Sequence, residues 1–377
     1  MSDLSHTMRL AGIDIGTLTC RLLIADLSSD GQLREVRSDR RILRLGEGVD
    51  QTKQLSSSAM DRVLQCLREW REMIAASSVD AAAVVATSAV RDAANRDEFL
   101  DRVKREAGFE VELLSGEEEA RRTLLGIRSG LPHGVTDLLA LDIGGGSTEF
   151  ILDRPGSLSD TDLSTAANDP RPSASFSARK NPQRIPANTP PVFPGLRPRI
   201  WPHLPRLVTN GNVGQAPNQN PVVRSIDVGV VRLRERLLHH DPPTEDEVRQ
   251  AREWIARETK VAVAGMDNYQ TATFVGTAGT ITSLAAMAQK LPAYEPARIH
   301  NYMLQLDTIQ ELEQTLLNRK KSDRASLPGL EKGREEVIAA GAIIIRTVME
   351  TLGVPSVLVS DMGLREGVLI DLATRMR

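Results

Sequence analysis

Apolar residues fall into two kinds of stretch along this chain: short continuous runs, and longer segments with a spacing of three or four residues. The short runs are typical of buried strands, and the longer spacing is typical of amphipathic helices. In the first part, strands are predicted at 9–16, 20–26, 33–45, 81–87 and 110–114, with helices at 56–76, 97–107 and from 115. In the second part, strands are predicted at 138–141, 150–152, 222–229, 271–275 and 356–360, with helices at 230–238, 244–263, 307–318, 335–352 and after 363. The stretch 155–223 shows neither period.

The most informative stretch is 138–153, LLALDIGGGSTEFILD, in which two predicted strands flank a run of three glycines. Because glycine has no Cβ, several backbone N–H groups in such a turn can converge on one anion. Asp142 and Glu149 flank the turn and are candidates to hold a divalent cation that offsets phosphate charge. The alternative is a purely structural hairpin with a glycine-rich tip and no ligand.

A weaker copy of this unit occurs at 9–26, where RLAGIDIG, a short hydroxyl-bearing turn and CRLLIAD follow one another. An internal repeat of this kind predicts two related domains that face each other across a cleft. Two such turns define a cleft for a phosphate chain. The candidate phosphate contacts are Asp14, Gly16, Thr17 and Thr19 in the first turn and Gly144, Gly145, Gly146, Ser147 and Thr148 in the second.

A third glycine-bearing turn, GTAGTITSL at 276–284, runs into a predicted helix. The free N–H groups of a helix N-terminus form a natural anion site. Gly276, Thr277, Gly279 and Thr280 are therefore further candidate phosphate contacts. Alternatively, these glycines only allow the strand and the helix to pack closely.

Two charged positions near the predicted cleft are candidates for catalysis. Arg91 follows the strand 81–87 and is able to grip a phosphate through its guanidinium, the alternative being an ion pair with Asp92 or Asp97. In SGEEEAR at 115–121, the serine is a candidate N-cap and the three glutamates suit the helix dipole. The functional alternative is that one of these glutamates reaches the cleft as the general base for a water molecule.

Composition narrows the class of protein. The chain has 377 residues, enough for two domains, and 41% of them are hydrophobic. A formal charge of −3 and an aromatic content of 3% argue against a general nucleic-acid binder. Cys20 and Cys66 have no metal-binding spacing, so reduced thiols in a cytoplasmic protein are expected. No signal pattern and no membrane-spanning run is present, so no membrane partner is expected.

The stretch 155–223 holds most of the prolines and many Ser, Asn and Gln residues. It is interpreted as a largely disordered insertion, peripheral to the chemistry. Its basic residues allow polyanion capture as an alternative to a solvated loop.

Seven motifs together resemble the exopolyphosphatase/guanosine pentaphosphate phosphohydrolase family, in the superfamily of actin, sugar kinases and heat-shock chaperones. They are GIDIGTLTCRLLIAD at 12–26, ATSAVRDAAN at 86–95, LLSGEEEAR at 113–121, LDIGGGSTEF at 141–150, GTAGTITSLAA at 276–286, GREEVIAAGAIII at 333–345 and SDMGLREGVL at 360–369. The resemblance implies an α/β fold with two ribonuclease H-like domains, 1–125 and 126–362, and an interdomain cleft. The C-terminal helix, about 363–377, is expected to pack back on the first domain.

The resemblance also implies an activity: Mg²⁺-dependent hydrolysis of the terminal phosphate of inorganic polyphosphate or guanosine pentaphosphate. By matching motifs, Glu119 is the expected base, with Glu118 the neighbouring alternative. Arg91 is the expected phosphate ligand, and Asp142 and Glu149 position metal and water. Another divalent cation, or K⁺, and a homodimeric assembly are compatible with the resemblance. An ATP-dependent small-molecule kinase and a non-catalytic sensor of polyphosphate or nucleotide stay open as alternatives.

The sequence departs from the family pattern in two turns. The first turn usually reads Gly-Ser-Asn-Ser, whereas here Leu18 replaces the polar amide, so the expected amide contact is absent. In the third turn, Ala278 replaces a common glycine.

Overall fold

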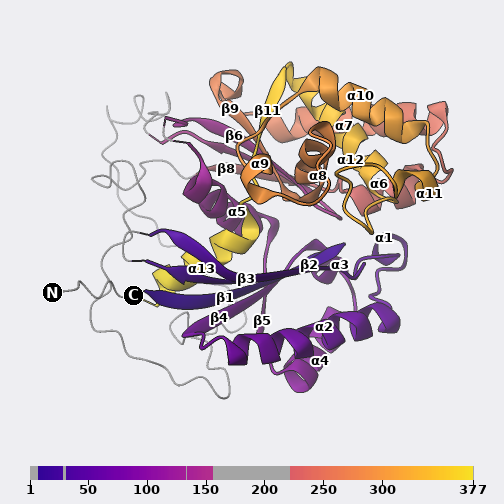
Figure 1. Ribbon diagram of the computed structural model, residues 1–377. Coiled ribbons are helices and arrows are strands. Elements are labelled where there is room, and N and C mark those ends of the chain that lie inside the picture. Colours follow the sequence, from indigo (N-terminus) through magenta and orange to yellow (C-terminus); the bar gives the residue numbers. More distant parts are fainter. Residues whose placement is uncertain (1–6, 29–30, 133, 156–220, 377) are drawn as a thin grey trace, which may run out of the picture.

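The computed structural model describes residues 7–28, 31–132, 134–155 and 221–376. These residues form two α/β units, each built around one mixed sheet (Figure 1). The predicted disordered insertion lies almost entirely outside the described residues.

The first sheet has the strand order β3-β2-β1-β4-β5. Strand β1 pairs antiparallel with β2, which pairs antiparallel with β3, whereas β4 and β5 run parallel to β1. The strands are β1 (Met8–Ile15), β2 (Thr19–Leu27), β3 (Leu33–Ile42), β4 (Ala81–Ala86) and β5 (Val111–Leu113). The helices are α1 (Val49–Thr52), α2 (Ser57–Ala76), α3 (Ser88–Asp92), α4 (Arg96–Arg102), a π-helical turn (Val103–Ala107) and α5 (Gly116–Gly130).

The second sheet repeats this order as β8-β7-β6-β9-β11, with β10 added antiparallel at the β11 edge. Its strands are β6 (Leu138–Ile143), β7 (Thr148–Asp153), β8 (Val222–Ile226), β9 (Thr273–Thr277), β10 (Met303–Gln305) and β11 (Ser356–Val359). Again the first three strands are antiparallel and the next two are parallel to the first. The repeated hairpins predicted from the sequence therefore begin two sheets of the same topology.

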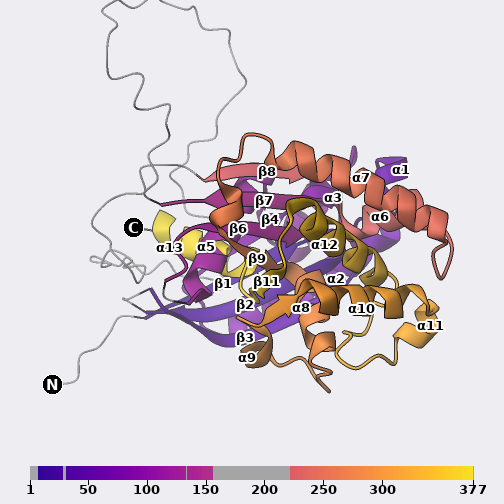
Figure 2. The ribbon, with the colours of Figure 1, turned by 90° about the horizontal axis from the view of Figure 1, so that it is seen from above.

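The helices of the second unit include a stack in which α12 packs between α7 and α10 (Figure 2). They are α6 (Val230–Leu237), α7 (Glu245–Val263), a 3₁₀ turn (Tyr269–Thr271), α8 (Ala278–Ala288), α9 (Pro296–Ile299), α10 (Leu306–Leu317), α11 (Lys321–Arg324), α12 (Ile338–Leu352) and α13 (Leu364–Arg375). The apolar face of α12 is buried in the largest hydrophobic cluster, together with the inner faces of β6 and β7. Burial of this continuous apolar surface is the main stabilisation of the unit.

Two helices cross at the junction of the units. Helix α13 follows the second sheet in the chain, yet its apolar side packs on β1, β2 and β4 of the first sheet. Helix α5 follows the first sheet, yet it packs on β6 and β7 of the second. The two helices approach closely where Gly126 faces the Gly363 carbonyl and Gly367 faces the Arg122 carbonyl, so that neither glycine has room for a Cβ. This crossing brings the start of α5 to the domain junction.

Several element boundaries differ from the sequence prediction. The strand predicted at 33–45 ends at Ile42, and the helix predicted at 97–107 changes from α to π geometry after Arg102. Strand β10 and the short helices α1, α3, α9 and α11 were not predicted. His300 follows α9, where its ring faces the Gly130 carbonyl and its Nδ1 accepts a hydrogen bond from the Asp361 N–H. These contacts join the end of α9 to the end of α5.

Candidate functional site

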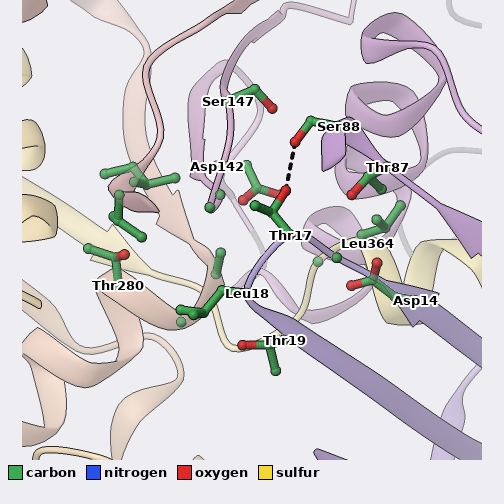
Figure 3. A pocket seen from close by; sticks show the side chains of 18 of the residues that line it. Asp14, Thr17, Leu18, Thr19, Thr87, Ser88, Asp142, Ser147, Thr280 and Leu364 are labelled. Atoms are coloured by element: carbon green, nitrogen blue, oxygen red, sulfur yellow. Dashed lines mark hydrogen bonds between the residues drawn. The ribbon is translucent and has the colours of Figure 1, made fainter. Parts of the chain in front are cut away.

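A cavity of about 80 Å³ lies between the two units, where their glycine-bearing turns meet (Figure 3). Of the residues predicted to bind phosphate or catalyse, it brings together Asp14, Gly16, Thr17, Thr19, Glu119, Asp142, Gly144, Gly145, Ser147, Thr277, Gly279 and Thr280. Arg91, Gly146, Thr148, Glu149 and Gly276 do not line it directly. The sequence interpretation missed the lining residues Arg21, Thr87, Ser88, Val230, Arg334, Gly363 and Leu364.

Two of the missed residues are cations that face the cavity from opposite units, Arg21 of β2 and Arg334 ahead of α12. The alternation of side chains along β2 was the signal that would have found Arg21, because Arg21 shares a face with Thr19. No local pattern marks Arg334, which reaches the site through the packing of α12 on α8.

The first turn is held by its own backbone and by the neighbouring strand. The Gly16 N–H donates to the Thr19 carbonyl at 3.1 Å, and the Leu18 carbonyl accepts from the N–H groups of Leu43 and Arg44. The Leu18 side chain is buried in the hydrophobic cluster of the second unit. The residue that departs from the family pattern thus ties the first turn to the opposite domain.

The second turn is held from behind by α6. Its Gly144 carbonyl accepts from the Val230 N–H at 3.1 Å, and its Gly145 carbonyl accepts from the Val231 N–H at 2.8 Å. The N–H groups at positions 145–147 have no acceptor among the residues that the structure describes. With its carbonyls fixed on one side, the turn keeps these three donors for a ligand, as an anion-binding nest requires.

The second turn packs against two residues of the first unit, Thr17 of the first turn and Ser88 of α3. Thr17 Oγ1 and Ser88 Oγ are 2.8 Å apart, a buried hydrogen bond within the first unit that is marked in Figure 3. A Cβ at Gly146 would collide with Ser88 Oγ, and a Cβ at Gly145 would lie 2.8 Å from Thr17 Cβ. Two of the three glycines are therefore required for the close approach of the domains as well as for N–H exposure.

Glu118 and Glu119 have different environments, although they are neighbours. Glu118 completes a capping box: its Oε2 accepts from the Ser115 N–H at 2.8 Å, and the Ser115 hydroxyl accepts from the Glu118 N–H. Glu119 is buried and lines the cavity, with Arg91 Nη1 3.2 Å from its Oε2. The geometry therefore favours Glu119 over Glu118 as the carboxylate available for chemistry.

The partner of Arg91 differs from the alternative considered from the sequence. Arg91 Nη1 donates to the Leu114 carbonyl at 2.9 Å as well as to Glu119, and it makes no ion pair with Asp92 or Asp97. Asp92 instead binds Arg232 of the second unit. The alternative pairing with Asp92 or Asp97 is not formed, because Arg91 lies on α3, which turns its side chain toward the start of α5.

Four carboxylates are buried around the cavity, and the pKa of each is raised. Burial, reinforced by the charge of Glu149, raises the pKa of Glu119 well above its usual range, although Arg91 opposes the shift. Burial raises the pKa of Asp14 to about 6 and, together with the charge of Asp142, that of Glu149 to about 7. Burial also raises the pKa of Asp142. A group of close, desolvated carboxylates favours a bound cation, which would relieve their repulsion.

The donor set allows a test of the expected metal site. Asp142 and Glu149 are paired in register on β6 and β7, so their side chains lie on the same face of the sheet. Asp14 Oδ1 is buried without a hydrogen-bond partner among the described residues. No group of three or more His, Cys, Asp or Glu side chains is arranged to ligate a metal within the described part of the chain. Two carboxylates fit Mg²⁺, which takes one or two of them and completes its shell with water and substrate phosphates.

The third turn differs from its predicted form. Strand β9 continues through Gly276 to Thr277, and α8 begins at Ala278. Ala278 has a φ of 69°, a left-handed conformation that glycine adopts at lower cost. The preference of related sequences for glycine here has this physical reason. Gly279 lies against the Arg334 guanidinium, where a Cβ would collide.

The site therefore combines turn N–H donors, two lining cations and buried carboxylates at the junction of two repeated α/β units. These features define a phosphate-binding enzyme that works between two domains. Comparison with known proteins shows which family of enzymes the chain resembles. A model of the Ppx/GppA phosphatase family matches residues 23–159 and 215–376.

Individual relatives match over nearly the whole chain. Exopolyphosphatase 2 of Mycobacterium tuberculosis is 30% identical over 377 residues, which span 97% of this chain and 98% of that protein. Guanosine-5'-triphosphate,3'-diphosphate pyrophosphatase of Aeromonas hydrophila is 26% identical over 96% of this chain and 59% of its own length. The crystal structure of the Aquifex aeolicus Ppx/GppA family member has 30% identity and a TM-score of 0.68, covering 98% of this chain and 99% of that one.

The chain belongs to the Ppx/GppA phosphatase family and is a phosphohydrolase. The predicted fold class, two ribonuclease H-like α/β domains, is confirmed by the shared sheet topology and by this structural match. Within the described residues, no helix combines the length and apolarity needed to cross a membrane.

Proposed function

We propose that this protein hydrolyses the terminal phosphoanhydride bond of inorganic polyphosphate or guanosine pentaphosphate and releases phosphate. Relatives named for each activity align along the chain. One observation carries the proposal furthest: a buried glutamate, Glu119, faces the same cavity as the glycine turn with its free N–H groups. A hydrolase of this kind needs both a base and an oxyanion cradle.

In the proposed reaction, the N–H groups of the second turn hold the oxygens of the terminal phosphate. The phosphate contact predicted for Arg91 would require its guanidinium to turn into the cavity from its present bonds to Glu119 and the Leu114 carbonyl. Glu119 accepts a proton from a water molecule as the water oxygen forms a bond to phosphorus. The opposite bond, to the bridging oxygen, breaks, and the shortened chain leaves with that oxygen. Burial and the charge of Glu149 raise the pKa of Glu119, which makes its ionised form a stronger base than an exposed carboxylate. Catalysis of this type is largely positioning and charge stabilisation.

Asp142 and Glu149 are the proposed holders of Mg²⁺, with another divalent cation or K⁺ as alternatives. When bound, the cation would offset the negative charge of the phosphate chain. Thr123 Oγ1 donates to Asp142 at 3.3 Å and Ser225 Oγ donates to Glu149 at 2.9 Å, so both carboxylates are oriented by hydroxyl groups. Orientation of ligands by such outer contacts supports metal affinity.

A phosphate-release assay on both substrates, with Glu119→Gln and Glu118→Gln compared, tests the assignment. Glu119→Gln should lower kcat by about 10²–10⁴, the usual loss for a general base. Glu118→Gln is the matched control, because it makes the same chemical change one residue away and Gln at this position can still complete the capping box; its kcat should stay within about threefold and its stability close to that of the wild type. Full activity of Glu119→Gln would refute the role of Glu119. A phosphorylated acceptor in place of free phosphate would indicate the kinase alternative.

A further inference from the structure

Helix α6 contacts both parts of the site. Its first N–H groups bind the carbonyls of the second glycine turn. Within the same first turn of α6, the Arg232 side chain reaches the first domain, where its Nη2 lies 2.5 Å from Asp92 Oδ2 and its Nε lies 3.3 Å from Asp50 Oδ1. Arg232 Nη1 also binds Asp227, just ahead of α6. One buried guanidinium therefore joins carboxylates from both domains.

Asp92 is the residue next to Arg91 on α3. That short helix begins with Ser88, which is hydrogen-bonded to Thr17 of the first turn, and it carries Arg91, which is bonded to Glu119. The first three residues of α3 are buried, whereas Asp92 ends the helix at the surface that faces the second domain. The ion pair between Arg232 and Asp92 thus holds the end of α3 that presents Arg91.

The ion pair is well shielded from solvent. The Arg232 side chain is 8% exposed and that of Asp92 28%, so water screens this contact much less than a surface pair. Removing the guanidinium would leave Asp92 without its cross-domain partner, whereas Asp50 would keep its ion pair with Arg236. The link between α3 and the second domain would then be lost, and the domains would separate.

We infer that Arg232 is a positioning residue that couples closure of the domains to the placement of Arg91 and Glu119. The inference rests on the proposed function. The N–H groups of α6 join Arg232 to the phosphate-binding turn. The ion pair with Asp92 joins Arg232 to α3, the helix that carries Arg91. Arg91 of the first domain, which binds Glu119, and the phosphate-binding turn of the second domain are therefore set relative to each other by this residue.

The test compares Arg232→Gln, Arg232→Lys and Asp92→Asn with Arg236→Gln. Arg236 is the matched control: it lies on the same helix and also crosses to the first domain, but it binds Asp50 and does not contact α3.

Arg232→Gln should lower kcat about 10²-fold, because small displacements of catalytic groups have costs of that size. Arg236→Gln should change kcat less than about threefold, as expected for a more exposed ion pair. Arg232→Lys should restore only part of the loss, since lysine cannot bind several carboxylates through a planar fork.

Two readouts separate positioning from a merely structural role. The double variant Arg232→Gln with Asp92→Asn should lose no more kcat than Arg232→Gln alone, because the two changes break one contact. In addition, KM should change less than kcat, with the far-ultraviolet circular dichroism of the folded protein unchanged. Additive losses, or a kcat that stays at the level of the wild type, would overturn the inference.

Small-angle X-ray scattering of the intact protein, with no substrate added, gives a result that does not depend on activity. A larger radius of gyration for Arg232→Gln than for both the wild type and Arg236→Gln would support the coupling. Identical scattering for all three would overturn it. If the wild type releases no phosphate from either substrate, the proposed function fails, and scattering alone then decides whether Arg232 controls closure.

Discussion

The two hairpin turns that meet at the site have the same origin in the fold but different properties. Both follow the first strand of a mixed sheet and both begin with Asp-Ile-Gly. The second keeps three N–H groups free because α6 binds its carbonyls from behind. The first has its Leu18 carbonyl bound by the next strand and its Leu18 side chain buried in the opposite domain.

This difference indicates a division of roles between the repeated units. In the second turn the proposed contacts to phosphate come from the backbone, and side chains would obstruct them. In the first turn a side chain, that of Leu18, packs into the opposite domain. The proposed hydrolysis needs both features, since Arg91 of the first domain and the phosphate-binding turn of the second act together only when the domains are closed.

The largest effect should follow from adding one carbon to the second turn. In Gly146→Ala the new Cβ would overlap Ser88 Oγ, so the turns would be unable to approach. We expect kcat/KM for phosphate release to fall at least about 10²-fold, the scale of loss for misplaced catalytic groups. Steady-state kinetics on polyphosphate measure the change.

A second substitution, at Ser88, provides the control for this prediction. Adding Ser88→Ala to Gly146→Ala removes the obstructing oxygen and leaves Thr17 Oγ1 at 3.2 Å and Ser88 Cβ at 3.4 Å, distances that a small shift of the Thr17 hydroxyl accommodates. The double variant should regain most of the lost activity, less the contribution of the Thr17–Ser88 hydrogen bond. Ser88→Ala alone measures that contribution. No recovery in the double variant would mean that Gly146 acts through something other than the contact between turns.

The contrast between the turns also explains which features of the fold and the site could be predicted from the sequence. The repeated Asp-Ile-Gly hairpins, which depend on local pattern, predicted both sheets and most of the cavity lining. Three features depend instead on which helices cross at the junction. They are the partners of Arg91, the position of Arg334 and the contact of the Leu18 side chain with the second domain. Those contacts join residues far apart in the chain, and no local spacing encodes them. The choice between Glu118 and Glu119 was likewise decided by the capping geometry of α5.

A smaller effect is expected from shortening the side chain that ties the first turn to the second domain. Leu18→Ala removes buried apolar atoms from the second domain's cluster, a change that costs about 2–5 kcal/mol when the whole side chain is buried. Because part of this energy is gained only on closure, we expect KM to rise about tenfold or more. Leu18→Met, which conserves volume, should remain close to the wild type. An unchanged KM in Leu18→Ala would show that closure does not depend on this contact.

The smallest effect concerns a charge that supports the first turn indirectly. Arg44, whose N–H binds the Leu18 carbonyl, places Nη1 2.5 Å from Glu336 Oε2 of the second domain. Burial opposes ionisation of Glu336, but hydrogen bonds from Arg44 and Lys321 and the charge of Arg234 outweigh it and lower its pKa to about 2. A carboxyl group whose pKa is lowered by folding contributes stability above its ordinary value of 4.5, and this stability is lost as pH falls toward 2.

Glu336→Gln should therefore reduce the free energy of unfolding at pH 7 by about 1 kcal/mol, the upper range for a partly exposed ion pair. Between pH 4.5 and 2 the difference from the wild type should disappear, because the wild-type carboxyl becomes neutral over that interval. Urea titrations across this range measure both quantities. Glu253→Gln is the matched control, since it removes the same charge from an exposed ion pair with Arg249 and should leave the pH dependence unchanged. A Glu336→Gln curve parallel to that of the wild type at every pH would show that the tie between the first turn and the second domain is carried by Leu18 and not by charge.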